Sequence, residues 1–258
     1  MAPSTKSNPS PLKKGTGAVF PTKFTPPPTL QPPERERENM LAKVPSIRFV
    51  LPGDPRTGLI LTAGVCHNNG RPNPKGGWGI QCGADFAGTI WTAAGRLENK
   101  GPFGDDGPQT HHRAELRAAL AALRLEHWPE EKFHTLVIAT DSEYVVEGST
   151  TFVKRRIEKD WKRRKGASVA NRDLWEALFG EIEKFAEEKM AVKFWRVAKE
   201  WNETALFAAK RAVEESDDAG DSFEDRMWPV SMMPGAVPET QRRRKKAQKH
   251  SASGEKSA

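Results

Sequence analysis

The sequence has few of the features that mark secreted or membrane proteins. It contains only two cysteines, Cys66 and Cys82, which excludes a disulfide-dense scaffold, and their spacing matches no zinc motif. No apolar run approaches the roughly 18 residues that a membrane span requires. The first residues lack the apolar core of a secretory signal. We therefore expect an intracellular protein with no membrane partner, and we predict that it is a monomer.

Proline and glycine are abundant instead. The 258 residues include 20 prolines and 21 glycines, and ten of the prolines lie within residues 1–45. A segment of that composition buries too little apolar surface to offset the entropy lost on ordering it. We predict that residues 1–46 form a disordered proline-rich arm open to protein partners, and that residues 217–258 form a disordered tail. Residues 47–216 are predicted to form one globular domain.

Positive charge is concentrated in three places, although the whole chain carries a formal net charge of +7. Residues 1–46 hold seven basic and three acidic residues, and residues 239–258 hold seven and two. Within the domain, residues 151–165 hold eight basic and two acidic residues. That cluster, either a nucleic-acid handle or a solvated helix face, includes Lys154, Arg155, Arg156, Lys162, Arg163, Arg164 and Lys165.

A second basic run lies in the tail, from Arg242 to Lys249. A run of this kind is typical of a nuclear localisation signal, and we expect a nuclear protein. General electrostatic attachment to nucleic acid is the alternative reading of the same run.

Hydrophobic periodicity predicts an alternation of strands and helices in residues 47–216. Strand patterns at 58–66, 77–83 and 88–98 precede a helix that Thr110 is placed to cap. A buried strand at 135–140, helical pieces after it, a helix at 171–188, a strand at 192–198 and a helix at 201–215 follow. This order predicts an α/β fold with a mixed five-stranded sheet, a three-strand antiparallel meander plus two parallel strands, flanked by helices.

Five short motifs lie along this predicted domain. They are TAGVC at 62–66, THHRAEL at 110–116, TDSEYV at 140–145, NRDLW at 171–175 and EWNETA at 200–205. In that order they resemble the T-D-G-[SA]-C, T-x-x-R-A-E-L, T-D-S-x-Y-V, N-x-D-L-W and N-E-x-A-D motifs of the type 1 ribonucleases H. Each motif alone is weak, but five in order make the domain similar to that family over nearly all of its length. The resemblance implies the RNase H-like fold and two-metal hydrolysis of RNA–DNA hybrids, with Mg²⁺ or Mn²⁺ as cofactor.

The resemblance also places the four metal-binding carboxylates of the family. They fall on Ala63, Glu115, Asp141 and Leu206, so only Glu115 and Asp141 remain as catalytic and metal-binding candidates. In the family the first carboxylate bridges both ions, so we expect the remaining pair to hold one ion at most, and weakly. Glu203 lies three residues before Leu206, about 5–6 Å away on a helix, and is a possible substitute for the fourth carboxylate.

Ordinary structural roles explain some of these residues equally well. Glu115 suits a helix dipole, and Asp141 with Ser142 suits a helix cap. The family resemblance implies nucleic-acid contacts at six further residues, although asparagines also suit turns and caps, and histidines an exposed helix start. Those six residues are Cys66, Asn69, His111, His112, Arg113 and Asn202.

Three functional hypotheses follow from these patterns. The leading one is an RNase H-like protein that still binds nucleic acid, an RNA–DNA hybrid or a structured RNA, but is catalytically impaired. The second is an active, metal-dependent hybrid endoribonuclease. The third is a protein-interaction scaffold that uses the proline-rich arm and has no nucleic-acid role.

Overall fold

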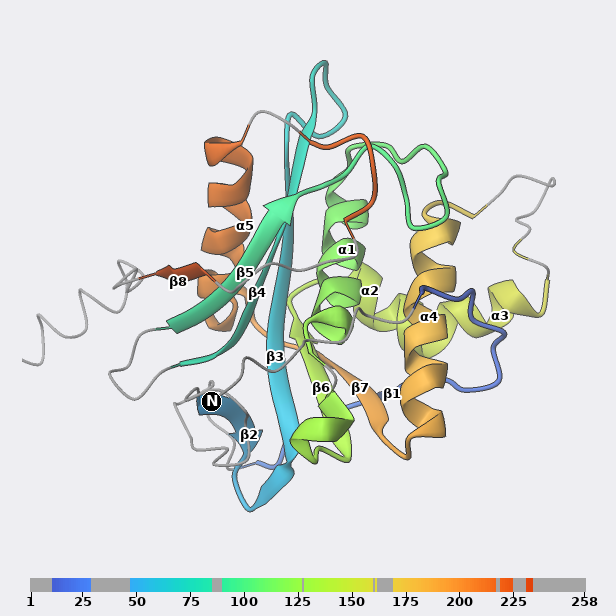
Figure 1. The fold of residues 1–258 in the computed structure, drawn as a ribbon, viewed down its shortest axis with the longest axis vertical. Helices are drawn as coiled ribbons and strands as arrows, with labels where there is room; N and C mark the ends of the chain where they lie inside the picture. Colours follow the sequence, from blue (N-terminus) through green and yellow to red (C-terminus); the bar gives the residue numbers. More distant parts are fainter. Residues whose placement is uncertain are drawn as a thin grey trace, which may run out of the picture.

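The computed structural model shows one mixed sheet with helices on both faces (Figure 1). This architecture confirms the predicted fold class. The residues that the structure describes are 11–28, 47–84, 90–126, 128–159, 161, 169–216, 219–224 and 231–233. None of the helices in these ranges has the length and hydropathy of a membrane span.

The five predicted strands form the body of the sheet. They are β3 (Asp54–His67), β4 (Lys75–Ala84), β5 (Ile90–Arg96), β6 (Thr135–Thr140) and β7 (Ala191–Arg196). β3, β4 and β5 form the antiparallel meander, while β6 pairs parallel with both β3 and β7. The register places Leu61 beside Ala139 where the β3–β6 ladder ends. β6 therefore ends beside Thr62 and Ala63, while β3 continues to His67.

Three short strands extend the sheet beyond the predicted five. They are β1 (Thr22–Lys23), β2 (Ile47–Leu51) and β8 (Ser231–Met233), and the full order is β1-β7-β6-β3-β2-β4-β5-β8. β2 lies between β3 and β4 where those strands diverge. β1 covers the outer edge of β7 and β8 that of β5. Strand edges expose unpaired backbone groups, and pairing with β1 and β8 covers part of the outer edges of β7 and β5.

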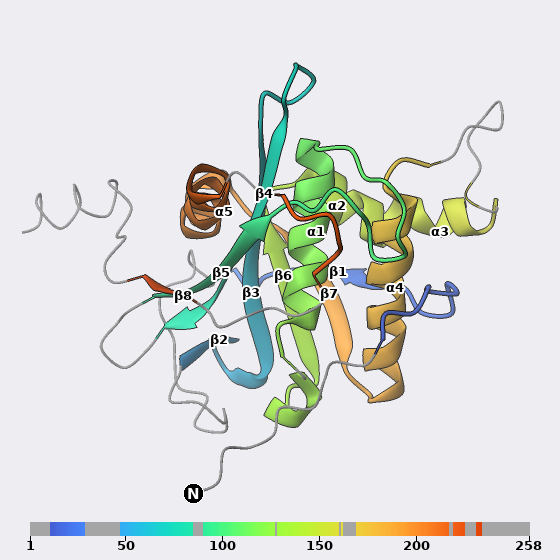
Figure 2. The ribbon, with the colours of Figure 1, turned by 45° about the horizontal axis from the view of Figure 1, so that its top comes forward.

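Helices cover the two faces of the sheet unequally (Figure 2). α1 (His111–Arg124) and α4 (Arg172–Glu187) lie on one face, and α5 (Glu203–Glu215) lies on the other. The larger apolar core lies between the sheet and α1, with Leu116, Leu120 and Leu123 fully buried. Short helical pieces lie between β6 and α4: α2 (Glu143–Glu147), a π-helical turn (Gly148–Phe152) and α3 (Val153–Ile157).

The predicted helix start at Thr110 is confirmed. The Thr110 side chain accepts a hydrogen bond from the backbone N–H of Arg113 and so satisfies one of the free donors of the first turn of α1. α2 begins in the same way, because Ser142 accepts from the backbone N–H of Val145. The cap after β6 is therefore Ser142, and the carboxylate of Asp141 is left for another role.

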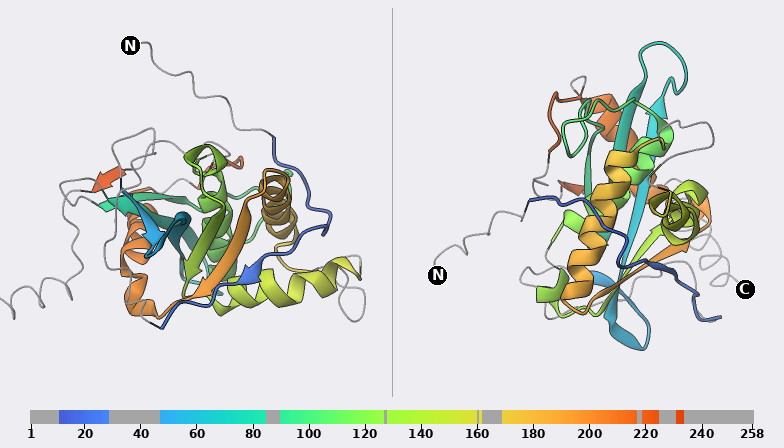
Figure 3. Two further views of the ribbon diagram at one scale, coloured as in Figure 1. Left: turned by 90° about the horizontal axis from the view of Figure 1, so that it is seen from below. Right: turned by 90° about the vertical axis from the view of Figure 1, so that its right-hand side faces the viewer.

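Part of the arm expected to be disordered is ordered against the domain. Residues 11–28, which we call the N-terminal strap, run along α4 and add β1 to the sheet (Figure 3). Leu12, Val19 and Phe20 pack on the larger core, and Phe24 packs edge-on against Trp195 at 5.5 Å. The composition argument fails here because these few apolar residues meet a prepared surface on the domain. Residues 1–10 and 29–46 lie outside the described residues.

Residues 219–224, which were assigned to a disordered tail, also lie on the domain. The backbone N–H of Asn99 donates to the carbonyl of Gly220 at 3.2 Å, and the guanidinium of Arg117 lies over the Phe223 ring at 4.4 Å. These residues of the predicted tail therefore contact the domain, and β8 pairs with β5. The basic run from Arg242 to Lys249 lies outside the described residues.

Candidate carboxylate site and nucleic-acid interface

The candidate site lies where β6 ends beside the inner part of β3, and where α1 and α5 begin. Ala63 and Asp141 each stand two residues beyond the end of the β3–β6 ladder. Helix α1 reaches this site because Gly64 has no side chain: a Cβ at Gly64 would lie 2.1 Å from the backbone nitrogen of Glu115. Local packing therefore brings the two surviving carboxylates, Glu115 and Asp141, to the same site.

Glu115 is nearly buried and is paired with His111. Nε2 of His111 lies 3.1 Å from Oε1 of Glu115, one helical turn away. The hydrogen bond to Glu115 raises the pKa of His111, and the negative charge of Asp141 contributes in the same direction. Burial and the charge of Lys199 oppose the increase in that pKa. The other oxygen of Glu115, Oε2, is buried and has no hydrogen-bond partner.

Asp141 is held by a buried asparagine. Nδ2 of Asn202, which is completely buried, donates to Oδ1 of Asp141 at 2.6 Å and to the carbonyl of Thr62 at 2.9 Å. These two bonds connect the start of α5 to the end of β6 and to β3. The side chain of Asn202, for which the family resemblance implied a nucleic-acid contact, is thus enclosed and joins three elements of the domain.

Ala63 and Leu206, the positions at which the family resemblance places carboxylates, also have apolar surroundings. Ala63 is 2% exposed and belongs to an apolar cluster with Leu61, Ala139 and Ala205. Leu206 is partly buried and packs on the same cluster. An ionised carboxylate in such surroundings is costly unless a cation or hydrogen bonds compensate it. The site is therefore filled by packing at these positions.

This arrangement does not fit a pair of divalent ions. Mg²⁺ takes several charged or carbonyl oxygens in near-octahedral geometry, and the described residues contain no group of three or more His, Cys, Asp or Glu placed to hold a metal ion. Glu203, the possible substitute, begins α5 but does not complete such a group with Glu115 and Asp141. One oxygen of Glu115 already bonds His111, and one of Asp141 bonds Asn202.

Comparison with known proteins decides the family. The RNase H family model matches residues 56–214. Ribonuclease HI of Rickettsia prowazekii (strain Madrid E) is 35% identical over 126 residues, which cover 49% of this chain and 71% of the relative. Ribonuclease H of Cyanothece sp. (strain PCC 7425 / ATCC 29141) is 34% identical over 119 residues, which cover 46% and 66%. The chain belongs to the RNase H family.

Solved structures with a similar chain path include two RNase H proteins of low identity. The crystal structure of LC9-RNase H1, a type 1 RNase H with the type 2 active-site motif, is 24% identical, with a TM-score of 0.47 over 72% of this chain and 84% of that chain. The RNase H domain of the foamy virus PFV is 15% identical, with a TM-score of 0.43 over 61% and 94%. The family assignment therefore rests on the sequence matches.

In this RNase H-family chain, an exposed polar and aromatic surface surrounds the start of α1. Oδ1 of Asn69 accepts the backbone N–H of His111 at 3.2 Å, and the ring of His112 stacks on Tyr144 with centroids 4.3 Å apart. The thiol of Cys66, whose pKa is raised by burial, donates to the carbonyl of Gln109 at 3.4 Å. Of the predicted contacts, Cys66, Asn69, His111 and His112 thus lie around one helix start.

Sequence reasoning did not single out the side chains that hold this surface in place. Tyr144 is the only tyrosine of the chain, and its hydroxyl accepts from Asn171 and from Nε1 of Trp175, both at 3.2 Å. Gln109 joins the start of β4 to the residue after β5, because its Oε1 accepts from the backbone N–H of Gly76 and its Nε2 donates to the carbonyl of Leu97. Tyr144 lies in the motif at 140–145 and Asn171 in the motif at 171–175, so these motifs are the sequence signal that could have identified the two residues.

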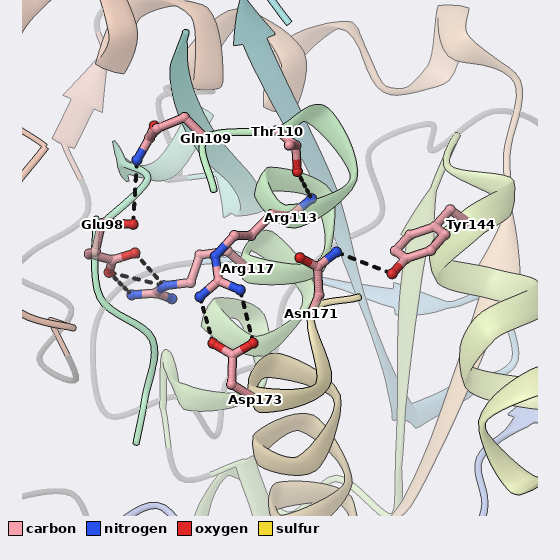
Figure 4. A network of polar contacts seen from close by, with 8 residues as sticks. All are labelled: Glu98, Gln109, Thr110, Arg113, Arg117, Tyr144, Asn171 and Asp173. Atoms are coloured by element: carbon pink, nitrogen blue, oxygen red, sulfur yellow. Dashed lines mark hydrogen bonds and ion pairs between the residues drawn. The ribbon is translucent and has the colours of Figure 1, made fainter. Parts of the chain in front are cut away.

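Arg113 is buried, and its side chain points to Asp173 at the start of α4 (Figure 4). Its guanidinium is 2% exposed and forms two bonds to Asp173, at 2.9 and 2.5 Å, so it joins the start of α1 to the start of α4. The side chain for which the family resemblance implied a nucleic-acid contact is thus engaged within the domain. Arg117, one turn further, forms a similar buried pair with Glu98 at 2.7 Å.

The basic cluster is described only in part. Lys154 and Arg155 are exposed on α3, and Arg156 is half-buried. α3 follows α2, whose first residues lie beside the stacked His112 and Tyr144. Lys162, Arg163, Arg164 and Lys165 lie outside the described residues.

Proposed function

We propose that this RNase H-family protein binds nucleic acid, an RNA–DNA hybrid or a structured RNA, and is catalytically impaired. One observation carries the proposal: Ala63 and Leu206, at the positions of two family carboxylates, pack in an apolar cluster beside the surviving Glu115 and Asp141. Two-metal hydrolysis needs charged oxygens on both ions, and this site supplies too few. Binding does not need those ions, because phosphates are contacted by basic and polar side chains.

The surface at the start of α1 supports the binding half of the proposal. His111, His112 and Asn69 are exposed there, and exposed aromatic rings stack on the bases or sugars of nucleic acids. Lys154 and Arg155 add positive charge on α3. The basic run at 242–249 remains a predicted nuclear localisation signal and a second site of electrostatic attachment.

A salt titration tests where the binding lies. Filter binding of a labelled hybrid is measured from low to high salt for the wild type and for a triple variant, Lys154→Gln, Arg155→Gln and Arg156→Gln. The control removes three exposed charges near the opposite ends of the strands, with Arg56→Gln, Lys132→Gln and Lys189→Gln. We expect the first variant to lower the salt slope by about two to three and the control to leave it nearly unchanged. No affinity at low salt would refute the proposed binding.

A cleavage assay tests the impairment. The labelled hybrid is incubated with the wild-type protein in Mg²⁺ and in Mn²⁺, with Asp141→Asn as the matched control. We expect no cleavage beyond that of the control. Cleavage by the wild type that Asp141→Asn abolishes would overturn the proposal.

An active hydrolase is the second candidate, and one observation favours it. Oε2 of Glu115 is buried without a hydrogen-bond partner, which is costly for a carboxylate oxygen unless a cation binds it. A single ion on Glu115 and Asp141 could then act as a weak Lewis acid. The double variant Ala63→Asp with Leu206→Asp should raise hybrid cleavage if only these carboxylates are missing.

A further inference from the structure

The carboxylate of Glu183 on α4 binds the backbone of the N-terminal strap, next to an ion pair of Lys14 with Glu176 at 3.0 Å. The backbone N–H groups of Thr16, Gly17 and Ala18 donate to Oε1 of Glu183 at 3.0, 2.6 and 3.0 Å, and that of Thr16 also donates to Oε2 at 2.9 Å. The hydroxyl of Thr16 donates to the same carboxylate at 3.2 Å. Three successive N–H groups on one anion form a backbone nest, which Gly17 permits with its φ of +81°. At residues 16–18 the backbone of the strap is therefore bound by a single negative charge.

Two glycines fit the strap to the helix. A Cβ at Gly180, in the middle of α4, would lie 2.0 Å from the carbonyl oxygen of Lys13. A Cβ at Gly15 would lie 2.5 Å from Cβ of Phe179, and the backbone N–H of Gly15 donates to the carbonyl of Glu176 at 2.7 Å. Glycine within a helix costs about 1 kcal/mol relative to alanine. The contacts that this close approach allows offset the cost. The two glycines therefore indicate that docking of the strap is a specific feature of this fold.

We propose that Thr16 is a phosphorylation site and that its modification releases the N-terminal strap from α4. The Thr16 side chain is exposed, so an enzyme can reach its hydroxyl when the strap opens locally. Lys13 and Lys14 precede it, and basic residues before the acceptor suit a protein kinase with an acidic substrate cleft. The modified oxygen lies 3.2 Å from both carboxylate oxygens of Glu183.

The chemistry is a phosphoryl transfer from a nucleoside triphosphate. A bond forms between Oγ1 of Thr16 and the terminal phosphorus, and the bond from that phosphorus to the nucleoside diphosphate breaks. The hydroxyl proton passes to the kinase base, and the diphosphate leaves. The product carries close to two negative charges at pH 7, beside a carboxylate that already uses the local N–H donors. Like charges at that separation repel, so the phosphate and Glu183 cannot share the nest.

Release of the strap would change more than α4. Lys23, at β1, pairs with Glu147 of α2 at 2.6 Å, and the ring of Phe20 lies under the ammonium of Lys154 on α3. Loss of the strap therefore exposes the outer edge of β7 and removes the support of α3. The inference concerns the docking of the strap and holds whether or not α3 binds nucleic acid.

The first experiment asks whether the site is accessible in the folded protein. The full chain and a synthetic peptide of residues 11–22 are incubated with ATP and a serine/threonine kinase that prefers lysine or arginine two to three residues before the acceptor. Mass spectrometry then locates the phosphate. We expect Thr16 to be modified in both. Modification of the peptide with none in the full chain would overturn the proposal.

The second experiment asks whether charge repulsion releases the strap. Phosphothreonine is encoded at position 16 in the wild-type chain and in Glu183→Arg, and hydrogen exchange of residues 15–18 is measured with and without the phosphate. In the wild-type chain we expect the phosphate to speed exchange about tenfold or more, because charge-assisted hydrogen bonds are lost. In Glu183→Arg the phosphate should slow exchange, since arginine pairs with it.

A neutral variant separates the charge from the lost hydroxyl. Thr16→Val removes the hydroxyl and leaves the three backbone N–H bonds to Glu183, so its exchange should stay close to that of the wild type. A phosphate effect of the same sign in the wild type and in Glu183→Arg would overturn the proposal, as would no effect in either.

Discussion

Replacing Ala63 by aspartate tests whether packing has closed the carboxylate site. Ala63 is 2% exposed and lies among Leu61, Ala139 and Ala205, so an aspartate there would be desolvated beside the surviving acids of the site. Burial of this kind raises a carboxyl pKa by about 3 units or more, from about 3.9 in the unfolded chain. The folded protein then keeps the proton, and the unfolded chain releases it, across the pH range between the two pKa values.

The sign and size of the effect follow from proton linkage. Because the native state binds more protons than the unfolded state in that range, the free energy of unfolding falls as pH rises, by about 1.4 kcal/mol per pH unit. Between pH 5 and pH 7 the loss amounts to about 2.7 kcal/mol when the folded pKa lies above 7. At pH 5 the loss from ionisation alone is about 1.5 kcal/mol, and the cost of packing the larger polar side chain adds to it at every pH.

Urea unfolding at pH 5, 6 and 7 measures this dependence. Ala63→Asn is the matched control, since asparagine has nearly the shape of aspartate but does not titrate. We expect the difference in the free energy of unfolding between Ala63→Asn and Ala63→Asp to grow with pH. Parallel pH curves for the two variants would mean that side chain 63 reaches water, and they would refute the reasoning from the apolar cluster. Added Mg²⁺ should leave the unfolding of the wild type unchanged.

Three further results are expected. Gly180→Ala, which would normally stabilise a helix by about 1 kcal/mol, should instead displace the N-terminal strap and speed tryptic cleavage after Lys13; unchanged cleavage would contradict the close approach of 2.0 Å. Arg113→Met should destabilise the protein by about 3–5 kcal/mol in urea unfolding, and adding Asp173→Leu should recover most of that loss, since a lone buried charge is then removed. Burial raises the pKa of Cys82 to about 11, so iodoacetamide at pH 8 should label it only after unfolding, and its ionisation should lower stability as pH rises from about 9 towards 11. Rapid native labelling would show that Cys82 is accessible.

The predicted strands and helices were found because their signals are local. The apolar run at 135–140 is β6, and Thr110 caps α1, as the spacing of residues within a few positions indicated. The added strands β1 and β8 have only two and three residues and carry no comparable apolar run, whereas β2 (IRFVL) does. β1 and β8 form through backbone pairing with strands distant in the chain, such as β1 with β7, and composition does not report such partners.

The sequence motifs identified the residues of the site, but they did not show which groups those side chains contact. Arg113 and Asn202 sit in motifs, so the sequence marked them, but their partners Asp173 and Thr62 are 60 and 140 residues away. Whether a polar side chain faces water or a distant partner depends on packing between elements. Composition predicted disorder at residues 11–28 for a similar reason. The contact with Glu183 is made by backbone N–H groups, which do not depend on side-chain type and so leave no signal in the composition.

By itself the sequence determined the fold class, the order of the five main strands, and the family through its ordered motifs. It also showed that two of the expected carboxylates are missing, because that follows from residue identity alone. Only the tertiary structure decided that Ala63 and Leu206 share an apolar cluster, that Asn202 holds Asp141, and that the strap closes on α4. These contacts join residues far apart in the chain, and their energies depend on burial and approach distance, which exist only once the elements have packed.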